Sequence, residues 1–182
     1  MSLFTRRPGV QDPATWMPPG TTVVQRYRNT LGEREGAIVL VYTADGDRGT
    51  SRYAAVCLGC TFRASKTVAH NPMSEQDAAK AANAHTASCR AMNRGVPAAP
   101  DDIEAATIVR DRLWSLRQHG SRAHAVSLSD FHADRVALQR PADFIKETMH
   151  QLVQSEPHFV TAEPCASGTG TRFLVQPHPA RT

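Results

Sequence analysis

Apolar residues in the first third of the chain fall into three short segments that have the composition of β-strands. Residues 37–43 (AIVLVYT) are apolar almost throughout, which predicts the central strand. Residues 23–29 (VVQRYRN) and 52–57 (RYAAVC) are strand candidates on either side of it. The segments LGEREG and DGDRGT, with their glycines and acidic residues, separate the three and predict turns. An antiparallel meander is therefore the expected arrangement.

The segment that follows these strands has the composition of a helix. Residues 74–92 are rich in alanine, and Ser74 and Asp77 stand where an N-cap and its reciprocal partner three residues later are found. We expect the helix to end before residues 94–101, where one glycine and two prolines predict a linker between two domains.

Both ends of the chain have few residues suited to regular structure. Residues 1–22 contain four prolines and two glycines, a composition that disfavours helix and sheet alike. We expect an arm here, with Trp16 and Met17 as its packing anchors. Residues 178–182 are expected to form a short tail.

The second half of the chain predicts helices followed by a hairpin. Within residues 101–120, the side chains of Ala106, Val109, Leu113 and Leu116 fall on one face, as in a helix packed on a core. A short strand over 124–128 and a short helix over 129–135, opened by Ser129, are expected next. A longer helix is expected over 140–157, with Pro141 at its first helical position and an apolar stripe of Ile145, Met149 and Leu152. A hairpin over 158–176 is expected to follow it.

Composition limits the class of protein. A chain of 182 residues that is 41% hydrophobic can bury a core and form one domain or two small ones. Arginine far outnumbers lysine and alanine is abundant, as in proteins encoded by GC-rich bacterial genomes. No apolar run reaches the roughly 18 residues of a membrane helix, and the N-terminus lacks the apolar core of a signal peptide. We therefore expect a cytoplasmic protein without membrane contact.

Charge is distributed unevenly along the chain. The 21 basic and 17 acidic side chains give a net charge of +4. The basic excess lies in residues 1–96, whereas residues 97–182 are close to neutral. Arg26 and Arg28 stand at alternate positions of a predicted strand and share one face. A basic face of this kind can contact phosphates, and a solvated strand face explains the same residues.

Four residues have the spacing of a metal site: Cys57 and Cys60, then 24 intervening residues, then His85 and Cys89. Residues four apart on a helix lie on one face, so the last two can hold a single ion, and the paired cysteines add two thiolates. This soft ligand set suits tetrahedral zinc and leaves no position for a substrate. A redox pair at the first two cysteines, unliganded buried thiols, and His70 in place of His85 are the alternatives.

Residues 51–92 resemble zinc fingers of the hairpin-plus-helix kind in the variant with ligand order Cys-Cys-His-Cys. Tyr53 and Phe62 flank the paired cysteines where such fingers keep aromatic residues, and the helix ligands are four apart as in that family. The gap of 24 residues is about twice the usual one of about 12. Zinc modules that brace a small sheet are therefore the closer analogy, and the resemblance implies structural Zn²⁺.

The element order over residues 102–177 resembles that of a winged-helix domain: helix, short strand, short helix, longer helix and hairpin. The resemblance implies DNA binding, with the longer helix in the major groove and the hairpin on the backbone. The side chains placed to contact DNA are Arg140, Lys146, His150, Gln151 and Arg172. The same fold also serves protein contacts, and the near-neutral charge of this half favours that alternative.

These observations predict an α+β protein with a small antiparallel sheet and a zinc-clipped helix, followed by a winged-helix-like domain. The expected divisions are an arm over 1–22, a zinc module over 23–93, a linker over 94–101, the second domain over 102–177 and a tail over 178–182.

The first functional hypothesis is a DNA-binding regulatory or mobile-element protein of bacteria, with a homodimer as one possible state. The second is a zinc-braced adaptor that binds another protein. No nucleophile, base and orienting group stand at a recognisable spacing, so an enzyme is not expected, and Cys165 is expected as a free thiol at the hairpin tip.

Overall fold

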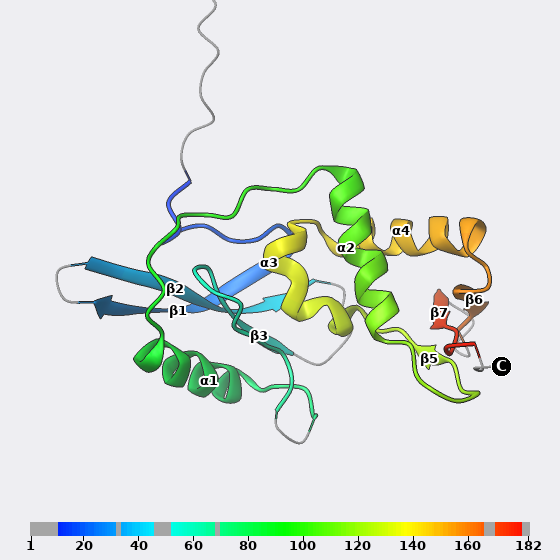
Figure 1. Cartoon of the computed structure of the whole chain (residues 1–182), viewed down its shortest axis with the longest axis horizontal. Coiled ribbons are helices and arrows are strands. Elements are labelled where there is room, and N and C mark those ends of the chain that lie inside the picture. The colour runs from blue at the N-terminus through cyan, green and yellow to red at the C-terminus, as the bar shows by residue number, and fades with distance from the viewer. Residues whose placement is uncertain (1–10, 32–33, 46–51, 68–69, 166–169, 180–182) are drawn as a thin grey trace, which may run out of the picture.

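The structure, a computed structural model, describes residues 11–31, 34–45, 52–67, 70–165 and 170–179 (Figure 1). These residues form a mixed α/β fold that contains a four-stranded antiparallel sheet, a three-stranded antiparallel sheet and four α-helices. Two sequence predictions lie partly outside the described residues, namely the arm at residues 1–10 and the tail at residues 180–182.

The predicted meander is confirmed. The first sheet has the order β1-β2-β3-β4, and each strand pairs antiparallel with the next. Its strands are β1 (Thr21–Leu31), β2 (Arg34–Ala44), β3 (Tyr53–Cys57) and the short β4 (Arg63–Ala64). Every residue of β2 from Gly36 to Tyr42 is buried, which requires both faces of the sheet to be covered.

Helix α1 (Glu75–Ser88) covers one face of this sheet. The predicted capping box is present: the Ser74 hydroxyl accepts from the amide of Asp77, and the carboxylate of Asp77 accepts from the amide of Ser74. Ala78 and Ala82, four residues apart, form the buried side of the helix and pack against the sheet. Because alanine side chains are small, the helix axis can approach the strands closely.

The opposite face of the sheet is covered by the arm and by the second half of the chain. Figure 1 shows the sheet between α1 on one side and the short helix α3 (Arg135–Leu138) on the other. Ile38 and Leu40 of β2 pack here against Trp16 and against Val136 of the second half. Trp16 is therefore a packing anchor, as predicted. Met17 is not, because 54% of its surface is exposed.

The second half of the chain builds a separate core. In chain order its elements are α2 (Asp102–Ser115), β5 (His124–Ala125), the 3₁₀ helix η1 (Leu128–Asp134), α3 (Arg135–Leu138), α4 (Ala142–Ser155), β6 (Val160–Pro164) and β7 (Thr171–Val175). The strands form a sheet of order β5-β7-β6. The predicted stripe of α4 is buried in this core, with Ile145 and Met149 at its centre.

Three details of the predicted helices are wrong. Ala105, not Ala106, joins Val109 and Leu113 on the buried face of α2. The side chain that caps the short helix is that of Ser127 rather than Ser129, because the helix begins one residue earlier than expected. Pro141 occupies the N-cap of α4 and not its first helical position. Each error is a shift of one or two residues at a helix end or face.

The two halves contact each other through buried polar groups. Arg135 of α3 is fully buried, and its Nη2 lies 2.8 Å from Oδ1 of Asp45 at the end of β2. The other carboxylate oxygen of Asp45 accepts from the backbone amide of Ala142, 3.0 Å away, and so caps α4 from the opposite half. The Tyr42 hydroxyl donates to the carbonyl of His132 at 2.6 Å.

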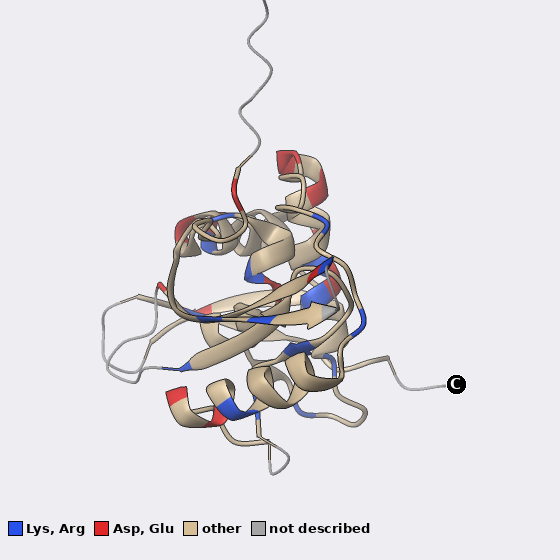
Figure 2. Cartoon of the chain, turned by 90° about the vertical axis from the view of Figure 1, so that its left-hand side faces the viewer, with Lys and Arg blue, Asp and Glu red and all other residues tan. Residues whose placement is uncertain are grey.

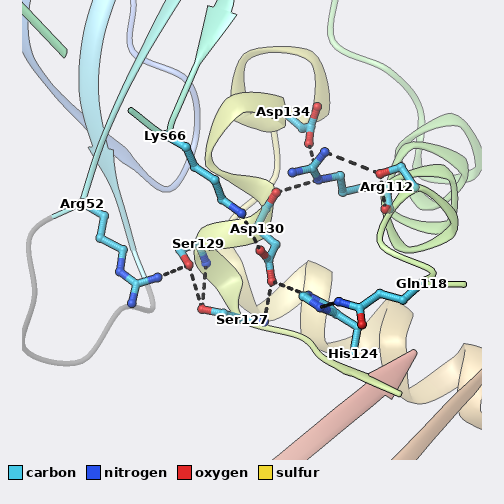
Figure 3. A network of polar contacts seen from close by, with 10 residues as sticks. Arg52, Lys66, Arg112, Gln118, His124, Ser127, Ser129, Asp130 and Asp134 are labelled. Atoms are coloured by element: carbon cyan, nitrogen blue, oxygen red, sulfur yellow. Dashed lines mark hydrogen bonds and ion pairs between the residues drawn. The ribbon is translucent and has the colours of Figure 1, made fainter. Parts of the chain in front are cut away.

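A second group of polar contacts extends this interface (Figure 3). Arg63 of β4 pairs with Asp134 at 3.0 Å, and Lys66 lies 3.9 Å from a carboxylate oxygen of Asp130. On the far side, Arg112 of α2 donates to the Asp130 carbonyl at 2.7 Å. The 3₁₀ helix η1 is thus held between the first sheet and α2.

In the described part of the chain, no helix combines the length and the apolar character that crossing a membrane requires.

Candidate metal centre

The paired cysteines occupy a tight turn at the end of β3. Cys57 is the last residue of the strand, and its amide donates to the carbonyl of Phe62 at 3.1 Å, which closes the turn around Cys60. The turn needs glycine at position 59, because a Cβ there would lie 2.4 Å from the Cβ of Ala37 and 2.8 Å from the carbonyl oxygen of Met92.

The other two ligands stand at the end of α1. His85 lies in its last turn, and Cys89 is the C-cap, where the chain leaves the helix in an extended conformation. The amide of Cys89 donates to the carbonyl of His85 at 2.8 Å, so the last hydrogen bond of the helix joins the two ligand residues. The helix packs on β3 through its alanines, and this packing brings its end to the turn of the paired cysteines.

The four potential ligand atoms converge on one point. The sulfurs of Cys57, Cys60 and Cys89 and a ring nitrogen of His85 all lie within 4.8 Å of one another. Sγ of Cys60 lies 4.0 Å from Sγ of Cys89 and 3.3 Å from Nε2 of His85. Four ligands about 2.3 Å from a shared centre stand about 3.8 Å apart at the corners of a tetrahedron, so these separations fit one tetrahedral ion.

Backbone amides point at the three sulfurs. Gly59 N–H approaches the sulfur of Cys57 at 3.4 Å, Phe62 N–H approaches that of Cys60 at 3.5 Å, and Ala91 N–H approaches that of Cys89 at 3.4 Å. Each donor lies two residues after its cysteine. Donors in these positions favour the negatively charged thiolate, which is the form that binds a metal.

Burial differs among the ligands. Cys57 is buried and Cys60 is exposed, whereas His85 and Cys89 are intermediate. Burial raises the pKa of the Cys57 thiol above its usual value, an effect that a bound cation reverses. Burial also lowers the pKa of His85, which favours the neutral imidazole that binds metals. The set has the chemistry of a metal centre that can hold one ion with protein ligands on all four sides.

The structure separates the two candidate histidines. His85 belongs to the cluster, whereas His70 is exposed outside it, in a left-handed conformation with φ of 60°. Phe62 has a clear position too: its ring stacks on that of His85 with centroids 4.0 Å apart. Cys165 is a free cysteine of intermediate exposure and stands outside the cluster.

The side chains predicted to contact DNA lie on or beside α4 and on β7, and all of them have partners within the protein. Lys146 pairs with Asp143 at 3.0 Å, and Gln151 donates to Glu147 at 3.3 Å. Arg140 forms an ion pair with Asp102 at 2.9 Å, and Arg172 forms one with Glu163 at 3.3 Å. The ring of His150 packs edge-on against that of Phe173. Lys146, His150, Gln151 and Arg172 are nevertheless exposed.

Sequence reasoning missed the residues that shape the centre without binding the ion. Gly59 and the three amide donors carry no signal of their own, because any residue supplies an amide and glycines are common in turns.

Comparison with protein-family models, with curated proteins and with solved structures finds no match to this chain. The assignment of the centre therefore rests on its geometry.

Proposed function

We propose that this protein binds DNA through its second half and that one structural zinc ion braces its first half. The metal part of the proposal rests on the ligand set. Three thiolates and one imidazole at tetrahedral separations are typical of zinc, and a site closed by four protein ligands stabilises a fold instead of activating water.

Metal content tests this part of the proposal. Protein purified without chelator is expected to contain one zinc per chain by elemental mass spectrometry. Cys89→Ala should lose most of this zinc, whereas Cys165→Ala, the matched cysteine outside the cluster, should keep it. A folded wild-type protein without metal would overturn the proposal.

The DNA-binding part rests on one observation, the order β5-β7-β6 of the second sheet. In winged-helix domains a strand that follows the first helix pairs with the last strand of the hairpin, and the longer helix precedes that hairpin. The order α2, β5, η1 with α3, α4, β6 and β7 follows the same scheme. We therefore infer a winged-helix-like half in which α4 enters the major groove and the β6–β7 hairpin contacts the backbone.

Exposed basic side chains of the first half support this assignment. Arg26 and Arg28 of β1 are exposed, and Arg34 at the start of β2 is exposed as well. Arg94, two residues after the antiparallel bridge between Gly36 and Met92, is also exposed. Figure 2 shows basic segments along this sheet, while acidic segments gather at the starts of α1 and α2. Arg28 pairs with Glu35 at 2.8 Å, and the other basic side chains of this sheet would supply the electrostatic attraction that α4 lacks.

A mobility-shift titration at increasing salt tests DNA binding. We expect binding to duplex DNA that weakens steeply between about 50 and 200 mM salt. The double variant Lys146→Ala with Arg172→Ala should bind more weakly and reduce the slope of log K against log salt by about 2. Lys80→Ala, an exposed charge on α1, is the matched control. Absence of any shift at low salt would overturn the assignment.

A second candidate function is supported by the ion pairs of α4. Since Lys146 is paired with Asp143 and Arg172 with Glu163, the exposed face of the winged-helix-like half is close to neutral. Such a face suits a protein partner, and the molecule would then be a zinc-braced adaptor. Absence of a DNA shift together with a stoichiometric protein complex on gel filtration would favour this candidate.

A further inference from the structure

A groove lies where the end of α2 meets the last residues after β7, away from the metal centre. It has a volume of about 1100 Å³ and is open to solvent. Trp114 lies in its wall with 46% of its surface exposed, although Phe159 beneath it is fully buried. The exposed part of this indole is a large, rigid apolar surface on which a planar ligand can stack.

Arginines flank this tryptophan. The guanidinium carbon of Arg117 lies 4.6 Å from the ring centroid of Trp114, and that of Arg110 lies 5.8 Å from it. Arg110 forms a two-point ion pair with Glu156, at 2.8 and 2.9 Å, which neutralises its charge. Arg117 instead donates to two backbone carbonyls, of Gln176 and Pro177, at 3.0 and 2.7 Å.

The charge of Arg117 is therefore available to a ligand. Within the described residues no carboxylate pairs with Arg117, and its Nη1 makes no hydrogen bond. The two carbonyl bonds hold the guanidinium in place, so binding an anion there costs little conformational entropy. The wall contains two positive groups, Arg110 and Arg117, and one negative group, Glu156, so the groove has one net positive charge.

Histidines extend the aromatic surface. His178 packs edge-on against Trp114, with ring centroids 5.8 Å apart, and stacks with His119 at 4.9 Å. Desolvation and the nearby charge of Arg117 lower the pKa of His178, which favours the neutral ring, a form that can donate at one nitrogen and accept at the other. His158 lies in the wall as well.

We propose that this groove binds a free nucleotide, with the planar base against Trp114 and the phosphate at Arg117. The part of the indole that Arg117 leaves uncovered offers a stacking surface to a base, and the guanidinium, fixed over the ring, offers the charge-assisted donors that a phosphate prefers. The polar atoms of Gln176 and of the histidines can bond to the base edge or the ribose. This site is independent of the metal centre and of DNA binding by α4.

Intrinsic fluorescence provides the test, because the chain has two tryptophans. In a Trp16→Phe variant, Trp114 is the sole indole, and its emission is titrated with AMP, GMP, CMP and UMP up to about 5 mM. Parallel titrations use the unphosphorylated nucleosides, inorganic phosphate, and a single-stranded oligonucleotide with a 5′-phosphate. We expect saturable quenching by at least one nucleotide and at least about tenfold weaker binding of its nucleoside and of phosphate.

Variants complete the test by calorimetry with the tightest nucleotide. Arg117→Met should weaken binding about tenfold or more, because it removes the charge. Trp114→Leu should abolish binding, and Lys80→Met on the distant helix α1 should leave it unchanged. The zinc content and thermal midpoint of each variant verify that it is folded.

Three results in the titrations with nucleotides, phosphate and variants would overturn the proposal. They are the absence of saturable quenching by any nucleotide, equal affinities for nucleotide and inorganic phosphate, and unchanged affinity in the folded Arg117→Met protein. Binding of the oligonucleotide alone would also overturn it, since the groove would then be a nucleic-acid site.

Discussion

The imidazole ring of His85 lies flat against the phenyl ring of Phe62, with centroids 4.0 Å apart and an angle of 7° between the planes. Phe62 also directs its amide at the sulfur of Cys60, 3.5 Å away. One residue thus orients two metal ligands, through its ring and through its backbone. Residues that orient ligands contribute to metal affinity although they do not touch the ion.

Replacing this ring should weaken metal binding. In Phe62→Ala the imidazole of His85 loses its stacking partner, and we expect metal affinity to fall about tenfold. Phe62→Tyr keeps the stack and should bind like the wild type. Competition against a coloured zinc chelator measures both affinities, and equal affinities for Phe62→Ala and the wild type would contradict this role of the ring.

The turn between the first two cysteines should not tolerate a side chain. In Gly59→Ala the new methyl group would lie 2.4 Å from the Cβ of Ala37, so the turn must shift and the sulfurs of Cys57 and Cys60 must move with it. We expect a lower thermal midpoint and weaker zinc binding.

Gly95→Ala is a suitable comparison for this variant. Gly95 has open space around it and a φ of +79°, so alanine there should cost about 1 kcal/mol of stability through backbone strain alone. Its zinc affinity should remain unchanged. Equal losses of zinc affinity in the two alanine variants would show that close packing at Gly59 is not what holds the ligands.

The contact between the halves predicts a large effect at an exposed position. Asp45→Ala removes the carboxylate that lies 2.8 Å from the buried guanidinium of Arg135 and that also caps α4 at Ala142. We expect a loss of about 3 kcal/mol in the free energy of unfolding, measured by urea denaturation. Asp143→Ala, which breaks the exposed pair with Lys146, should cost less than about 1 kcal/mol.

The pair between Glu156 and Arg110 predicts a pH dependence. Hydrogen bonds from Arg110 lower the pKa of Glu156 in the folded protein. Its contribution to stability is therefore present above the usual carboxyl pKa of about 4.3 and is lost as the pH falls through the lower folded-state value. Glu156→Gln should lower stability by about 0.5 kcal/mol at pH 7 and by nothing measurable near pH 2. A difference that persists unchanged at low pH would contradict this assignment.

Local sequence patterns predicted the elements well, and they predicted the four residues that form the cluster of three cysteines and one histidine. The apolar run of β2, the capping box at Ser74 and the spacing of His85 and Cys89 each depend on residues within one or two turns of each other, and such patterns are visible in the sequence. The cysteine pair and the end of α1 meet because α1 packs on the sheet, and both of these elements were predicted.

The contacts between the halves could not be predicted in the same way. Asp45 meets Arg135 and Ala142 across roughly ninety residues, and neither partner has a sequence signature. The cap of the short helix was misplaced for a related reason: Ser127 and Ser129 are equally good capping residues, and only the surrounding contacts decide between them. Trp114 has no sequence signature beyond its place in the predicted helix, and its exposure is visible only in three dimensions.

Coverage of the first sheet on both faces has a consequence for cells that are short of zinc. The arm and the second half cover one face, and α1 covers the other. Under the zinc proposal, metal loss would leave the end of α1 held over Val39 and Val41 only by its packing, by the hydrogen bond from Asn29 to the Cys89 carbonyl at 3.1 Å and by the stack of His85 on Phe62. If α1 then separates from the sheet, the exposed apolar face favours association with other chains and clearance by chaperones and proteases. Zinc supply would then govern how long the molecule survives after synthesis.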